Sequence, residues 1–147
     1  NEEGLILNEK DYVLKIVTTQ YTEGETEQIF MDTLAEVTGN KDSYYITYRD
    51  NDGDLAGCET RLHITGGSKI SINRRGIHNS HIIIEKSIRH LSHHITPQMS
   101  FTMGVSCVEM DSDFDNGRLR FRYATDIEMV PVGEIEFDFE FRKAERE

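Results

Sequence analysis

Residues 99–143 alternate between apolar and polar positions with a period of two. Because successive side chains of a β-strand point to opposite faces, this period predicts strands that each have one apolar and one polar face. Three such runs in succession favour an antiparallel meander with one buried face. The apolar positions are Met99, Phe101, Met103, Val105 and Cys107 in the first run, Leu119, Phe121, Tyr123, Ile127 and Met129 in the second, and Ile135, Phe137, Phe139 and Phe141 in the third.

The first hundred residues continue this rhythm, with turn signals about every ten to fifteen residues and no long helical pattern. The sequence therefore predicts an all-β fold, a single antiparallel β-barrel of about eight to ten strands with little helix. The barrel domain takes up residues 11–147, after an N-terminal arm of residues 1–10. The predicted strands in this part are residues 12–21, 27–37, 44–48, 58–64, 70–74, 80–87 and 88–95, and a helical turn is the alternative within the last of them.

Two of these segments carry apolar residues on both faces. In residues 27–37, Ile29 and Met31 share a face with Ala35 and Val37, whereas Phe30 and Leu34 lie on the opposite face. Residues 82–84 are three consecutive isoleucines. Such strands need cover on both sides, and a bulge, the N-terminal arm or a second subunit can supply it.

The last predicted hairpin offers a test of register. If Phe121 faces Phe139 and Tyr123 faces Phe137, then Arg122 opposes Asp138 and Arg120 opposes Glu140 on the outer face. Inner aromatic pairs and outer charge pairs then agree, so we predict this register.

The charge of the chain bears on its partners. The 147 residues include 16 Lys and Arg against 27 Asp and Glu, a formal net charge of −11. Such a surface repels nucleic acids and anionic membranes, so we expect neither as a partner. No apolar run reaches the roughly 20 residues that a membrane-spanning helix needs. Cys58 and Cys107 fall on predicted inward faces, where we expect reduced thiols and a bridge is the alternative; the expected location is the cytoplasm.

Three short motifs point to a known family. Asn73-Arg74-Arg75-Gly76 follows a strand, His94-Ile95-Thr96-Pro97 leads into residues 99–103, and an acidic loop precedes residues 118–123. Over about residues 12–141 the chain resembles the YwiB-like family, a bacterial domain of unknown function. The resemblance implies a calycin-like β-barrel related in shape to the lipocalins, with no established activity. The family pattern has an aromatic residue at the position of His94 and often an aromatic-Gly pair where Gln98-Met99 stands here, and these departures weaken any role that this rim would inherit.

Metal chemistry has weak support in the sequence. Histidines gather between residues 78 and 94, but on a strand His90 and His94 share a face while His93 points away, and a zinc site needs three or four converging ligands. The acidic loops at residues 50–54 and 111–115 begin like calcium loops, yet both lack Gly at the sixth position and Glu at the twelfth. We therefore expect no bound metal.

Catalytic motifs are also missing from the sequence. It contains no Gly-x-Ser-x-Gly elbow, no His-Glu-x-x-His helix and no phosphate-binding glycine loop. Cys107 is a candidate nucleophile, but a core thiol is inert without a basic partner. We expect a protein that is not an enzyme and that uses no cofactor.

The barrel interior is the remaining candidate site. Barrels of about eight strands are either filled by side chains or hold one small ligand. Apolar walls with a few polar groups suit a small apolar or amphipathic ligand. The alternative is a filled barrel that serves as a protein-interaction or homodimerisation module, with the two-faced strands at Phe30, Leu34 and residues 82–84 as its surface. The candidate ligand-binding residues at the lumen or rim are Arg74, His94, Thr96, Phe101, Met103, Phe121, Tyr123, Phe137 and Phe139.

Overall fold

The computed structural model describes residues 11–50, 56–77, 79–95 and 97–144, and it confirms the predicted all-β fold. The predicted N-terminal arm and the loop at residues 51–54 lie outside the described residues. Residues 88–95 include the strand β7, so the helical turn considered for this segment is wrong for residues 90–95. The elements are β1 (Asp11–Thr22), β2 (Glu25–Asn40), β3 (Ser43–Arg49), β4 (Glu59–Thr65), β5 (Lys69–Arg75), β6 (Ser80–Glu85), β7 (His90–Ile95), β8 (Ser100–Asp113), the 3-10 turn η2 (Phe114–Asn116), β9 (Arg118–Ile127) and β10 (Val130–Lys143).

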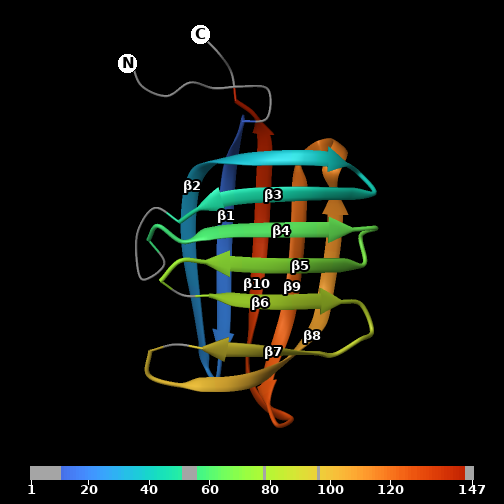
Figure 1. Ribbon diagram of the computed structural model, residues 1–147. Coiled ribbons are helices and arrows are strands. Elements are labelled where there is room, and N and C mark those ends of the chain that lie inside the picture. Colours follow the sequence, from blue (N-terminus) through green and yellow to red (C-terminus); the bar gives the residue numbers. More distant parts are fainter. Residues whose placement is uncertain (1–10, 51–55, 78, 96, 145–147) are drawn as a thin grey trace.

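The strands form one antiparallel sheet that closes almost completely into a barrel. Their order is β6-β5-β4-β3-β2-β1-β10-β9-β8-β7, so β6 and β7 lie at its two ends. Isolated bridges join Glu85 to Ile88 and Asn79 to Ile95 between these ends. Figure 1 shows two layers, in which the short strands β3 to β7 cross in front of the long strands β1, β2, β8, β9 and β10. The interior lies between these layers.

The long strands β2 and β8 take part in both layers. Residues 25–36 of β2 pair with β1, and residues 35–40 pair with β3. Residues 100–105 of β8 pair with β7, and residues 104–113 pair with β9. A bulge between Cys107 and Glu109 reverses the alternation, so Met110 is buried whereas Val108 is exposed. Bulges of this kind bend a strand and let it pass from one layer to the other.

Aromatic side chains fill much of the space between the layers. Phe121 and Phe139 have at most 1% of their surface exposed, as the alternation predicts. Their ring centroids lie 6.1 Å apart, and the ring of Phe137 lies 5.3 Å from that of Phe121. At the far end of the barrel, Tyr44 is fully buried and its hydroxyl hydrogen-bonds Ser112 Oγ at 2.7 Å. This contact joins β3 to β8 across the interior.

The predicted register of the last hairpin is wrong by two residues. Phe121 pairs with Phe137 and Tyr123 pairs with Ile135, so Arg122 faces Glu136 and Arg120 faces Asp138. The cause is a two-residue turn at Glu128 and Met129, whose φ angles of 51° and 70° are those of a type I′ turn. This turn alone would displace the pairing by three residues from the predicted register, and a bulge between Pro131 and Gly133 moves it back by one. A displacement of two residues leaves each side chain on its predicted face.

The apolar face of this hairpin does not stay buried to its end. Ile127 is the last residue of β9 and Met129 belongs to the turn, so both are exposed, and Met99 is exposed just before β8. Beside this turn, Arg89 forms a bidentate ion pair with Asp126, with distances of 3.0 and 2.7 Å. Asp126 also accepts a hydrogen bond from the Met129 amide. These contacts fix the β9–β10 turn against the start of β7.

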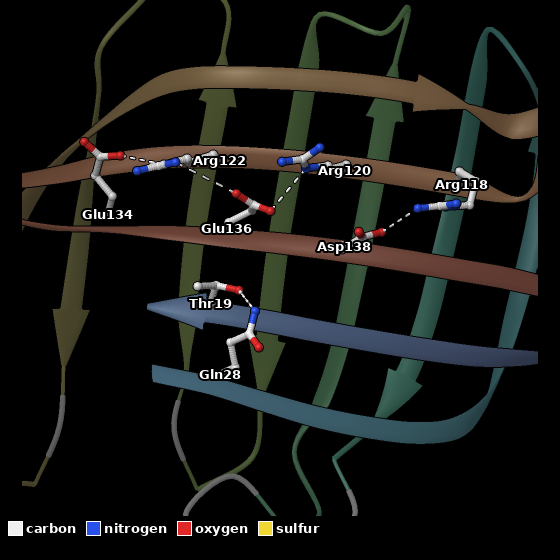
Figure 2. Close-up of polar contacts among 8 residues, drawn as sticks. All are labelled: Thr19, Gln28, Arg118, Arg120, Arg122, Glu134, Glu136 and Asp138. Carbon is white, nitrogen blue, oxygen red and sulfur yellow. Dashed lines mark hydrogen bonds and ion pairs between the residues drawn. The ribbon is translucent and has the colours of Figure 1, made fainter. Parts of the chain in front are cut away.

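The outer face of β9 and β10 carries a ladder of ion pairs (Figure 2). The pairs run diagonally rather than straight across, because Arg120 bonds Glu136 at 3.1 Å and Arg122 bonds Glu134 at 2.6 Å. Arg122 also covers the ring of Tyr21 at 4.0 Å. Exposed pairs of this kind contribute roughly 0–1 kcal/mol each, so the ladder selects the register more than it stabilises the fold.

The two-faced strands differ in their surroundings. Ile82 and Ile84 are buried in the core, so the hypothesis that residues 82–84 form a contact surface is wrong for these two residues. They face inward from β6, and only Ile83, which is half-buried, lies on the outer side. Phe30 by contrast is 71% exposed on β2. Ile29 is half exposed in the same stretch, which pairs with β1 but not with β3.

Candidate functional site

The candidate site begins with a polar row on the inner face of the barrel. Arg74 follows Ile70 and Ile72 on β5 with the same two-residue period, so its side chain enters the interior. The strands pair Arg74 with Thr60 and Thr60 with Tyr48, which places the three residues side by side on β5, β4 and β3. Arg74 Nε donates a hydrogen bond to Thr60 Oγ1 at 3.2 Å. Thr60 is 1% exposed, whereas Arg74 is half-buried.

Tyr48 and Tyr123 are both buried. Together with Arg74 and Thr60 they form the set that we call the polar row. Burial raises the pKa of Tyr48 to about 12, although the positive charge of Arg74 opposes the shift. Burial also raises the pKa of Tyr123 to about 12, and Arg74 again acts in the opposite direction. Tyr123 reaches Arg74 from β9, in the other layer. Both phenols are therefore protonated at neutral pH, and each can donate a hydrogen bond.

An aromatic wall adjoins the polar row. The ring of Tyr123 lies 6.4 Å from those of Phe121 and Phe137. Burial falls along this wall: Phe121 and Phe139 are fully buried, whereas Phe137 and Ile135 are only half-buried. The half-buried pair lies toward the β9–β10 turn. On β10 the inward side chains therefore keep more exposed surface toward this turn, although Tyr123 and Thr125 on the adjacent β9 are buried.

His94 and Phe101 contribute a second aromatic contact, on β7 and β8. Their rings stack with centroids 5.2 Å apart. Burial lowers the pKa of His94, and the neighbouring His93 lowers it further, so the neutral imidazole is favoured. His94 Nε2 lies 3.1 Å from Ser92 Oγ, which itself donates to the carbonyl of His81 at 2.7 Å. Met103 is half-buried one step along β8 from Phe101.

The structure thus brings most of the predicted ligand-binding residues to one interior. Arg74, Tyr123, Phe121, Phe137 and Phe139 form a continuous polar and aromatic set. His94, Phe101 and Met103 are half-buried on β7 and β8, and Phe101 and Met103 are not among the described side chains packed against the core cluster; Thr96 lies outside the described residues. The sequence analysis missed Tyr48 and Thr60. The alternation of β3 and β4 places both on inward faces, but only the pairing of β3, β4 and β5 sets them beside Arg74.

Described residues also line surface hollows away from this set, of which we describe two. The first, of about 440 Å³, is lined by Val13, Lys15, Arg142 and residues 116–118 and 140–141. The second, of about 360 Å³, is lined by Lys86, Arg120 and residues 109–111. The described residues that line them include none of the predicted ligand-binding residues.

The histidines and cysteines make separate contacts. His90 bonds Glu85 at 2.8 Å, and His93 bonds Thr102 at 2.8 Å from the outer face. In the described part of the chain, no group of three or more His, Cys, Asp or Glu side chains is placed to hold a metal ion. Cys58 and Cys107 are free thiols, and burial raises the pKa of Cys107.

Comparison with known proteins identifies the family. Residues 14–139 match the model of the domain of unknown function DUF1934. The chain belongs to the DUF1934 family. Among solved structures, the DUF1934 chain is similar to the crystal structure of the ywiB protein from Bacillus subtilis, with a TM-score of 0.71 and 16% sequence identity. The match covers 91% of this chain and 93% of that one, and it confirms the resemblance to the YwiB-like family.

These matches establish the fold and the family, and they do not assign an activity. None of the curated proteins compared with this DUF1934 chain matches it. Within the described residues, no helix is long and apolar enough to span a membrane. The function must therefore be argued from the inner face of the barrel.

Proposed function

We propose that this DUF1934 protein binds a small amphipathic molecule on the partly open inner face of its barrel and performs no catalysis on it. The observation that carries the proposal is the gradient of burial along the aromatic wall. Phe121 and Phe139 are fully buried, whereas Phe137 and Ile135 occupy the same inward face and remain half-buried. Inward aromatic residues that keep exposed surface provide apolar area for a ligand to cover.

The polar row supports an amphipathic ligand rather than a purely apolar one. Arg74 and the hydroxyl of Tyr123 lie beside the aromatic wall, so one molecule can contact both surfaces. Small-molecule sites commonly combine predominantly apolar walls with a few polar groups that orient the ligand. Met31, which is half-buried, adds apolar surface from β2 on the same inward side.

Binding of ten-carbon amphipaths tests this proposal. We expect decanoate or decanol, added below its micellar concentration, to bind with one-to-one stoichiometry in isothermal titration calorimetry. The same ligand should perturb the NMR signals of Phe137 and Met103 before those of outer-face residues such as Val13. If no amphipath of either charge type binds at millimolar concentration, the barrel is filled and the proposal fails.

A second candidate function is homodimerisation through β2. Residues 25–34 pair with β1 on one edge, and in the described part of the chain no strand pairs with the other edge. Phe30 is 71% exposed beside this edge. A free strand edge can pair with the same edge of a second copy. The carboxylates of Glu25 and Glu27 would then approach those of the partner, so salt should strengthen the association.

Sedimentation velocity measures this association directly. We expect the wild-type protein to shift toward the dimer as its concentration and the salt concentration rise. Phe30→Asp should remain monomeric, because it adds a charge at the apolar contact. A wild-type protein that stays monomeric at the highest concentrations would exclude the dimer while leaving ligand binding intact.

The free thiols support a cytoplasmic location within the same proposal. Reducing compartments keep such thiols unpaired, whereas oxidising ones favour disulfides. Cys58 is fully buried, and Cys107 is half-buried.

A further inference from the structure

We propose that the polar row is a receptor for an oxyanion headgroup, a carboxylate or a phosphate, held by Arg74 with Tyr48 and Tyr123. This inference rests on the proposed function, because it names the chemical class of the ligand that would occupy the inner face. It assigns the apolar tail of the ligand to the half-buried part of the aromatic wall.

The first argument is the surplus of hydrogen-bond donors. A guanidinium group has five N–H donors and no acceptor, and Thr60 Oγ1 accepts from Nε. Among the ion pairs formed by described residues, none includes Arg74. A planar oxyanion can accept two parallel N–H bonds from one guanidinium, which a hydroxyl group cannot do.

The second argument concerns the two phenols. Tyr123 is 4% exposed, and it lies close enough to Arg74 for the positive charge to act on its phenol. Tyr48 is 5% exposed, and its hydroxyl hydrogen-bonds the side chains of Arg74 and Thr60, so it helps to position Arg74. Burial keeps both phenols protonated, so Tyr123 is a neutral donor that an anion can use, while Tyr48 holds the Arg74 side chain beside it. An oxyanion at this point would accept a hydrogen bond from the Tyr123 hydroxyl as well as from the guanidinium group.

The third argument is electrostatic. The chain carries a net charge of −11, yet this part of its interior holds a cation. Among described carboxylates, Asp50 acts on Tyr48 from the end of β3, and its negative charge raises the pKa of that phenol. A half-buried cation attracts an anion more strongly than an exposed one, because the surroundings screen it less. A neutral or cationic headgroup would leave the donors of Arg74 without an acceptor.

Paired ligands and paired variants test the inference. The ligands are decanoate, decyl phosphate, decanol and decyltrimethylammonium, which share a ten-carbon tail and differ in their headgroup. Arg74→Gln removes the cation from the inner face. Arg75→Gln is the matched control, because Arg75 is the next residue of β5, is exposed, and faces Glu59 on the outer side. Calorimetry gives the affinity of each ligand for each protein.

We expect wild-type protein to bind decanoate or decyl phosphate at least about tenfold more tightly than decanol, a difference of about 1.4 kcal/mol. The stronger of the two anions identifies the headgroup. Arg74→Gln should weaken the anion at least about tenfold and change decanol less than twofold, whereas Arg75→Gln should change neither. Arg74→Lys keeps the positive charge but loses the paired N–H donors of the guanidinium. Its affinity for the anion should fall between those of wild type and Arg74→Gln.

Other outcomes separate the two levels of the proposal. If decanol or the cationic ligand binds as tightly as the anions, or if Arg74→Gln leaves anion affinity unchanged, the headgroup assignment is wrong while the ligand-binding function stands. If no ligand binds to wild-type protein, both fail. Tyr123→Phe removes only one hydroxyl from a packed ring, and it should weaken the anion severalfold even if Arg74→Gln does not fold.

Discussion

Replacing Phe139 with aspartate is expected to prevent the barrel from folding. Phe139 lies on β10 with 1% of its surface exposed, and its ring contacts those of Phe121, Phe137 and Tyr48. Loss of a buried phenylalanine ring costs about 3–5 kcal/mol. A carboxylate at the same position adds the free energy of burying a charge, which is several kcal/mol more. Because domains are stable by only about 5–15 kcal/mol, the variant should be unfolded at room temperature.

The neighbouring residue provides the control. Asp138 lies on the outer face of β10 and contacts Arg118 at 3.4 Å in an exposed ion pair. Asp138→Asn should therefore change the free energy of unfolding by less than about 0.5 kcal/mol. Urea unfolding followed by circular dichroism measures both variants. Similar losses of stability in the two would show that the inner and outer faces of β10 are assigned wrongly.

The second large effect is expected at Gly117, in the turn between η2 and β9. Its φ of 66° is left-handed, and a Cβ atom there would overlap the backbone carbonyl oxygen of Phe141. The Phe141 amide in turn donates to the Gly117 carbonyl at 2.8 Å, so the two strands meet backbone to backbone. Gly117→Ala should cost about 1–2 kcal/mol in backbone strain and about 1–3 kcal/mol more in displacing β10.

A second glycine isolates the contribution of the overlap. Gly67 has a φ of 65°, nearly that of Gly117, but a Cβ atom there meets nothing within 4 Å. Gly67→Ala should therefore lose only the strain, about 1–2 kcal/mol. The difference between the two alanine variants, measured as the free energy of unfolding in urea, reports the close approach of Gly117 to Phe141. Equal losses would contradict this close approach.

The fold class could be predicted because it depends on a pattern that the sequence displays openly. The alternation in β9 and β10 places Leu119, Phe121 and Phe139 inside, and the structure confirms all three. A two-residue period is insensitive to register, because a shift of two residues leaves every side chain on its face. Face assignments therefore survived the error in the hairpin register.

The register of the β9–β10 hairpin could not be predicted, because it depends on a turn conformation that the residue types do not indicate. Glu128 and Met129 adopt positive φ angles, although Gly and Asn are the usual residues of a type I′ turn. The Asp126 carboxylate stabilises the turn. It accepts a hydrogen bond from the Met129 amide and forms an ion pair with Arg89. Arg89 belongs to a different part of the chain, so this stabilisation becomes visible only once the barrel has closed.

The candidate site was predictable in part for the same reasons. Arg74 was a candidate polar residue of the lumen or rim, and the aromatic residues were identified by their two-residue period. Tyr48 and Thr60 were not identified, because recognising them requires the pairing of β3, β4 and β5. The approach of Tyr123 to Arg74 requires the packing of two layers, which no local pattern encodes.

A crystal structure of the protein grown with decanoate tests the central claim most directly, since that claim joins a partly open barrel to a cation inside it. We predict density for the carboxylate within hydrogen-bond distance of the Arg74 guanidinium and the Tyr123 hydroxyl, with the tail against Phe137. Decanoate bound only on the outer face, or an interior closed over Phe137 with no ligand at saturating concentration, would contradict the account.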